Sequence, residues 1–147
     1  MSHYVAVYGS LRAGLINHYL LGGSTLIGTI LHQGLTLYDL GEYPAALRHP
    51  STGVILEVYR IENATLALLD RLEDYEPLRP NDSLYLRETL KTPFGLCWVY
   101  LYNQSLAGVP IVASGDWLDY YSAKQASSGG CCPYSKKQVE ESLVRNK

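Results

Sequence analysis

The sequence predicts an α+β fold: a small, mostly antiparallel β-barrel or curled sheet with flanking helices. Two observations support this. Many short segments are rich in β-branched and aromatic residues, and residues 63–73 form one strongly amphipathic helical segment. The chain has 147 residues, of which 47% are hydrophobic and 18% charged, which suits one domain with a sizeable core.

The first half of the chain alternates strand-like segments with glycines. Residues 4–8 form a β-branched and aromatic run that stops at Gly9, which predicts a strand followed by a turn. The segments expected after it are a loop at 9–14, a short helix at 17–21 closed by Gly22 and Gly23, strand material at 25–38 broken by Gly28 and Gly34, and a short edge segment at 43–47.

The second half of the chain carries the clearest patterns. Residues 53–60 alternate between two sets of positions, which predicts a half-buried strand. The helix at 63–73 follows, with Asn63 as its expected N-cap. The last predicted pair of strands, 84–91 and 96–102, is joined by the hairpin signal Thr92-Pro93-Phe94-Gly95.

Composition divides the chain into a domain at residues 1–121 and a polar C-terminal tail at 122–147, which we expect to be mobile or weakly helical. Trp117 is expected to anchor a turn just before the tail. The three cysteines form no disulfide framework, which favours a reducing, cytoplasmic location. Cys97 is mid-strand and is expected to be buried and inert, whereas Cys131 and Cys132 lie in the tail.

Charge and composition also limit the partners. The net charge is -2 and there is no basic block, so neither nucleic acid nor an anionic membrane is an expected partner. No apolar run approaches the ~20 residues needed to span a bilayer. The histidines and cysteines show no zinc-like spacing, so we expect no metal and no cofactor.

One carboxylate stands out at the end of the predicted helix. Leu66, Leu69 and Leu72 form an apolar stripe, and Glu73 falls on the same stripe. Burial, the helix C-terminal dipole and the neighbouring acids are expected to raise its pKa toward the range of a general base. The alternative is that the helix frays at Leu72 and leaves Glu73 as a solvated turn residue.

The loop after the first strand is a candidate anion site. Gly9 permits close backbone approach, and successive N–H groups from Gly9 to Leu11 can form an anion-binding nest. Ser10 adds a hydroxyl, and Arg12 is a candidate partner for a substrate carboxylate. The alternative is an ordinary turn at the end of a strand.

Tyrosine is unusually abundant, with 13 copies against one phenylalanine, which suggests ring hydroxyls that reach polar partners or a wet cavity. Tyr8, Tyr85 and Tyr100 fall on predicted strands and are candidates to line such a cavity. The alternative for each is a surface cross-strand pair. No serine or cysteine nucleophile has a histidine in a recognisable setting.

A series of motifs resembles the γ-glutamylcyclotransferase-like superfamily, and most closely its small bacterial YtfP-type proteins and γ-glutamylamine cyclotransferases. The resemblance covers residues 4–120 and depends on the order of the motifs. In this sequence they are Val7 to Arg12, Asn17-His18, Tyr43-Pro44-Ala45, Gly53 to Arg60, Leu69 to Tyr75, Tyr85-Leu86-Arg87, Trp98-Val99-Tyr100 and Ser114 to Trp117.

The resemblance implies a mixed β-barrel with flanking helices and an enzyme that releases 5-oxoproline from a γ-glutamyl compound. It implies that Glu73 is the general base, that Tyr8 to Leu11 hold the glutamyl group through backbone atoms, and that Tyr85 lies near the base. One departure concerns the turn after the base, where Asp74 stands in place of the glycine common in the family.

Three function classes follow from these residues. The first is a cyclotransferase acting on a γ-glutamyl amine or short peptide. The second is a non-catalytic binding protein for γ-glutamyl or other carboxylate ligands, and the third is an adaptor that works through the tail. Loops at 38–50 and 74–83 are expected to set the substrate, while the sequence leaves the oligomeric state open.

Overall fold

The computed structural model describes residues 2–127 and has the expected α+β character. In chain order its elements are β1 (Ser2–Val7), the 3₁₀ turn η1 (His18–Leu21), β2 (Thr25–His32), β3 (Leu35–Asp39), β4 (Pro44–Arg48), β5 (Val54–Glu62), α1 (Asn63–Leu72), the 3₁₀ turn η2 (Pro80–Asp82), β6 (Tyr85–Thr92), β7 (Gly95–Tyr102) and α2 (Trp117–Ser127).

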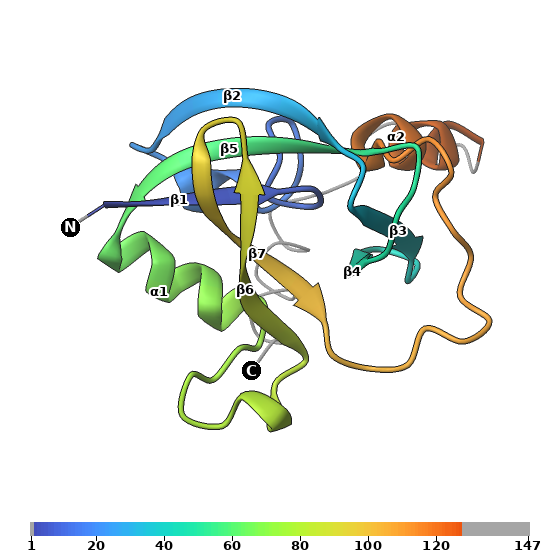
Figure 1. Ribbon diagram of the computed structural model, residues 1–147. Coiled ribbons are helices and arrows are strands. Elements are labelled where there is room, and N and C mark those ends of the chain that lie inside the picture. Colours follow the sequence, from blue (N-terminus) through green and yellow to red (C-terminus); the bar gives the residue numbers. More distant parts are fainter. Residues whose placement is uncertain (1, 128–147) are drawn as a thin grey trace.

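In the described part of the chain, seven strands form two separate sheets. Figure 1 shows their arrangement. The larger has the order β2-β5-β1-β7-β6, and it is antiparallel except where β1 lies parallel to β7 at Val5 and Trp98. Strands β3 and β4 form a two-stranded sheet of their own. The larger sheet ends in β2 and β6, so the described part of the chain shows no closed barrel. Closure depends on which distant strands pair, and residue patterns do not carry that information.

Both faces of the larger sheet are covered. Along β1, Val5 and Val7 pack in a cluster with α1, whereas Ala6 and Tyr8 pack in a second cluster with β3, β4 and α2. Figure 1 shows α1 and α2 at opposite ends of the curved sheet. The sequence predicted a strand at 53–60 with one buried and one exposed face. The exposed face is wrong, because Glu57 of β5, which lies on that face, is also buried.

Helix α1 presents Leu66, Leu69 and Leu72 to the core, as the stripe predicted. Asn63 is not the N-cap: Glu62 occupies that position without a side-chain hydrogen bond. The Oδ1 of Asn63 instead lies 2.5 Å from Nε2 of His3. The stripe thus predicted the buried face correctly, while the cap was misplaced by one residue.

The end of α1 is fixed by backbone hydrogen bonds. Glu73 is the C-cap, and Asp74 has a φ of 54°, in the left-handed region that usually selects glycine. The Tyr75 N–H donates to Asp70 O at 2.8 Å, and the Asp74 N–H donates to Arg71 O at 3.2 Å. These two bonds form a Schellman motif, so the helix does not fray before Glu73.

Helix α2 was not predicted from the sequence. Trp117 is fully buried at its start rather than in a simple turn, and the helix continues past residue 121, where the tail was expected to begin. The rest of the tail predicted at 122–147, with the cysteines Cys131 and Cys132, lies outside the described residues. Cys97 is buried as expected, and burial raises the pKa of its thiol.

Neither α1 nor α2, the two α-helices within residues 2–127, is long and apolar enough to cross a bilayer.

Replacing Asp74 by glycine should stabilise the fold. An L-residue in the left-handed region carries a steric cost that glycine avoids, so Asp74→Gly is expected to raise the free energy of unfolding by about 0.5–1 kcal/mol. Asp74→Ala, which keeps a Cβ and loses the polar side chain, should lower it. Urea denaturation of the three proteins tests this, and a glycine variant less stable than the alanine variant would contradict it.

Candidate active site

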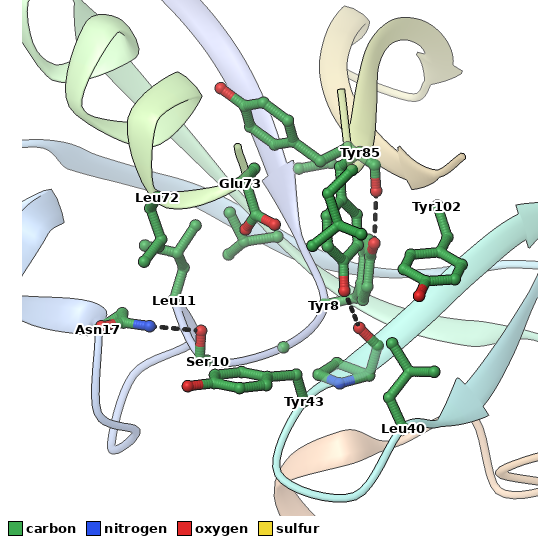
Figure 2. Close-up of a pocket in the computed structure, with 16 residues that line it drawn as sticks. Tyr8, Ser10, Leu11, Asn17, Leu40, Tyr43, Leu72, Glu73, Tyr85 and Tyr102 are labelled. Atoms are coloured by element: carbon green, nitrogen blue, oxygen red, sulfur yellow. Dashed lines mark hydrogen bonds between the residues drawn. The ribbon is translucent and has the colours of Figure 1, made fainter. Parts of the chain in front are cut away.

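A cavity of about 100 Å³ opens between the end of α1, the turn after β1, the loop before β4 and the β6–β7 hairpin (Figure 2). Its volume is enough for a small polar group and some water. Its lining residues are Ala6, Val7, Tyr8, Gly9, Ser10, Leu11, Asn17, Leu40, Tyr43, Pro44, Leu72, Glu73, Leu84, Tyr85, Tyr100 and Tyr102.

Among residues 2–127, Glu73 is the one acidic residue that lines this cavity. Figure 2 shows its carboxylate directed into the cavity from the end of α1. It is partly exposed because it borders the cavity, yet burial raises its pKa to about 8 from an ordinary value near 4.5. Desolvation is the cause, and not the acidic neighbours expected from the sequence: Asp70 instead forms an ion pair with Arg87 at 2.7 Å.

The turn after β1 supplies unpaired backbone donors. Gly9, Ser10 and Leu11 line the cavity, and their N–H groups donate to no group within residues 2–127. The turn is closed by the Arg12 N–H, which donates to Gly9 O at 2.9 Å, and by Asn17, whose Nδ2 donates to Ser10 Oγ at 2.8 Å. These contacts fix the turn beside the cavity and leave its three N–H groups available as hydrogen-bond donors.

Gly9 is needed for this arrangement. A Cβ at this position would lie 2.5 Å from Cγ of Pro44, closer than side chains approach in folded proteins. Any larger residue would push the turn away from the loop before β4. The cavity therefore depends on glycine at this contact.

Arg12 was expected to hold a substrate carboxylate, and it does not line the cavity. Its Nε donates to Glu57 Oε2 at 3.0 Å and its Nη1 donates to Asp116 Oδ1 at 2.7 Å. Glu57 also accepts from the Ala13 N–H at 2.9 Å and from the Tyr59 hydroxyl at 2.7 Å. Arg12 is thus buried and paired with two carboxylates, which fix the turn to β5 and to the residue just before α2.

The three tyrosines expected at the site all line the cavity and are buried, so they are not surface cross-strand pairs. The Tyr8 hydroxyl donates to Tyr100 O, and the Tyr85 hydroxyl donates to Pro44 O at 2.9 Å. The Tyr100 hydroxyl donates to Asp70 Oδ1 at 2.6 Å. Burial raises the pKa of all three hydroxyls, and the charge of Glu73 adds to the increase.

Behind Tyr100 lies a charged cluster outside the cavity. Asp70 accepts from both Tyr100 and Arg87, and the Arg87 guanidinium stacks 4.5 Å from the ring centroid of Trp98 and 5.3 Å from that of Tyr75. These contacts tie the last turn of α1 to the β6–β7 hairpin. They hold the segment that carries Glu73 against the strands that carry the tyrosines.

Several lining residues were not predicted as site residues from the sequence. Asn17, Tyr43 and Pro44 belong to motifs that were recognised but given no role. Tyr102 shares β7 with Tyr100, and its position two residues later placed it on the same face. Leu40, Leu72 and Leu84 carry no chemical signal that could have identified them. Within residues 2–127, no cluster of three metal-ligating side chains is present.

Comparisons with known proteins identify the family that this chain resembles. Residues 5–119 match the family model described as gamma-glutamyl cyclotransferase, AIG2-like. The Escherichia coli gamma-glutamylcyclotransferase family protein YtfP is 40% identical over 116 residues, which cover 78% of this chain and 96% of that protein. The solution structure of Escherichia coli ytfP aligns with a TM-score of 0.61 and 39% identity, over 80% of this chain and 97% of that one.

A more distant structure has the same fold. An uncharacterised protein from Pyrococcus horikoshii aligns with a TM-score of 0.69 at 22% identity, over 84% of this chain and 97% of that one. At this identity the likeness concerns the fold alone. The likeness shows that the same arrangement of curved sheet and helices occurs in a solved structure.

The pKa of Glu73 predicts a pH-dependent stability difference. Because the pKa is raised in the folded state, the folded protein holds this proton more tightly than the unfolded chain. The associated stability is fully present below about pH 4.5 and is lost as the pH rises through about 8. The Glu73→Gln variant has no carboxylate to ionise and so does not lose this stability. Its free energy of unfolding should therefore exceed that of the wild type by a margin that grows by about 1.4 kcal/mol for each pH unit between about pH 4.5 and pH 8.

Urea denaturation from pH 5 to pH 9 measures the difference. Glu76→Gln, which changes an exposed acid three residues away, is the matched control. A Glu73→Gln difference that stays constant across this range would show that the carboxylate is not desolvated in the folded state.

Proposed function

The chain belongs to the gamma-glutamyl cyclotransferase, AIG2-like family, and from that membership we propose that it releases 5-oxoproline from a γ-glutamyl amine or short γ-glutamyl peptide. In this proposal Glu73 is the general acid/base, and no cofactor takes part. The observation that carries it is a desolvated carboxylate facing one cavity with the unpaired N–H groups of the turn at Gly9 to Leu11.

The reaction needs few protein groups because the nucleophile is part of the substrate. The α-amino nitrogen attacks the δ-carbonyl carbon, and a five-membered ring closes as the bond to the departing amine breaks. Holding the two ends of the glutamyl group in a reactive pose supplies much of the rate advantage. A cavity of this small volume suits such a folded-back substrate.

Proton transfer is the task assigned to Glu73. Of the three protons on the substrate ammonium, one stays on the ring nitrogen and two leave with the departing amine. Glu73 accepts each of these two protons in turn from the attacking nitrogen and passes it to the leaving nitrogen, so it ends in its starting state. A pKa of about 8 suits both transfers near neutral pH, because neither protonation state is strongly disfavoured.

Negative charge that develops on the carbonyl oxygen needs hydrogen-bond donors. The N–H groups of Gly9, Ser10 and Leu11 are available for this role or for the substrate carboxylate, since they have no partner within the described residues. No arginine or lysine of residues 2–127 lines the cavity, so the backbone takes the place that the sequence had suggested for Arg12.

Loss of the carboxylate should abolish turnover. Glu73→Gln keeps the size and shape of the side chain but removes the base, so release of 5-oxoproline should fall by at least ~100-fold. The wild type, Glu73→Gln and the control Glu76→Gln would be incubated with a panel of γ-glutamyl amines and peptides, and 5-oxoproline would be quantified by mass spectrometry. Near-normal activity in Glu73→Gln would rule out the assignment, and binding without turnover by the wild type would favour a binding protein.

The pH dependence of kcat/KM should follow the same group. The base must be ionised, so kcat/KM is expected to rise with pH and to level off above an apparent pKa of about 8. A rising limb with an apparent pKa near 4.5, the ordinary value for glutamate, would contradict the desolvated site. Steady-state rates from pH 5 to pH 9 for the wild-type protein measure it.

A further inference from the structure

Two tyrosine hydroxyls at the cavity have their protons directed away from it. The Tyr8 hydroxyl donates to the backbone oxygen of Tyr100, and the Tyr85 hydroxyl donates to the backbone oxygen of Pro44 at 2.9 Å. Figure 2 shows both bonds on the side of the cavity opposite Ser10 and Leu11. Both residues line the cavity and both are buried.

A phenol has a single proton and can also accept hydrogen bonds. Because the proton of each hydroxyl is already engaged, Tyr8 and Tyr85 can offer a ligand only the lone pairs of their oxygens. Both stay protonated over the working pH range, since burial raises the pKa of each well above its usual value near 10. The two hydroxyls, which form one wall of the cavity, therefore accept hydrogen bonds from a ligand and do not donate to it.

The carboxylate of Glu73 lies close to the same wall. Glu73 lines the same cavity as both tyrosines, and its charge adds to the increase in their pKa that burial causes. Two neutral acceptors beside one anionic acceptor match a compact group that carries several N–H donors and a positive charge. An ammonium has three such donors and that charge.

The opposite wall has the reverse polarity. The N–H groups of Gly9, Ser10 and Leu11 are donors without partners in residues 2–127. A ligand with an ammonium and a carboxylate on one carbon would meet acceptors on one side and donors on the other. This is the head group of an α-amino acid.

We propose that Tyr8, Tyr85 and Glu73 form an ammonium subsite, which binds the α-amino group of the substrate as –NH₃⁺ and orients it toward the δ-carbonyl. This inference rests on the proposed function and assigns the two tyrosines a specific role within it. They position the nucleophile before Glu73 removes its proton. A free α-amino group then becomes a requirement for binding as well as for reaction.

The competing role for these tyrosines is donation to the oxyanion. It would require both hydroxyl protons to point into the cavity. The hydrogen bonds to Tyr100 O and Pro44 O engage those protons, and breaking them would leave two backbone oxygens without a donor. The two roles predict different effects of Tyr→Phe substitution, because donation to the oxyanion affects kcat whereas an ammonium subsite affects binding.

The test compares two ligands that differ only in the amino group: γ-glutamyl methylamide and its deamino analogue, glutaric acid monomethylamide. Dissociation constants would be measured by calorimetry at low temperature, while 5-oxoproline release is followed in parallel. Wild-type protein should bind the deamino analogue at least ~10-fold more weakly, because hydrogen bonds to a charged group are the strong ones.

The variants Tyr8→Phe and Tyr85→Phe should each weaken binding of γ-glutamyl methylamide by ~10-fold and change binding of the deamino analogue by less than ~2-fold. Tyr4→Phe, which changes a tyrosine of β1 that does not line the cavity, is the matched control and should change neither. Thermal unfolding of each variant shows whether the fold is retained.

The possible outcomes separate the two proposals. Equal affinity of the wild type for both ligands would overturn the ammonium subsite, even if neither tyrosine variant folds. Equal weakening of both ligands in the folded variants would overturn it as well, and so would a loss in kcat alone. Discrimination between the ligands with no release of 5-oxoproline would support the subsite and overturn the proposed function.

Discussion

Burial of one carboxylate is the constraint on which the site depends. Moving an ionised acid out of water is unfavourable, and no cation within residues 2–127 offsets the cost for Glu73. The protein therefore keeps this group in the cavity at the expense of stability near neutral pH. Such a position is retained where a proton-binding group is useful, and less often where only packing is needed.

Contacts in the surrounding fold fix the position of Glu73 at the cavity. The Schellman motif fixes the backbone at the end of α1, and Asp70 is clamped between Tyr100 and Arg87 one turn earlier. On the other side of the cavity, the Arg12 ion pairs fix the turn that carries the backbone donors. The two charged clusters lie outside the cavity, so they position the site without altering its contents.

Local patterns predicted the parts of this structure that depend on local rules. The leucine stripe identified α1 to within one residue of its end, and Thr92-Pro93-Phe94-Gly95 identified the β6–β7 hairpin, because both signals come from neighbouring residues. The open sheet and the second covered face of β5 depend on partners far apart in the chain. Arg12 follows directly after the turn, yet its side chain is directed to Glu57, and no sequence spacing reveals that direction. Helix α2 lacks an apolar stripe beyond Tyr121, so its length gave no periodic signal.

Pro44 joins two walls of the cavity. Its ring occupies the space that a side chain at position 9 would need, and its carbonyl accepts the Tyr85 proton. An altered residue at this point would disturb the donor turn and the acceptor wall together. Leu40 and Tyr43 line the cavity from the loop that precedes Pro44, and neither makes either of these two contacts. Substitution of these two residues can therefore change ligand preference without displacing the turn or Tyr85. The segment thus combines one residue that fixes two walls of the cavity with two neighbours that are open to change.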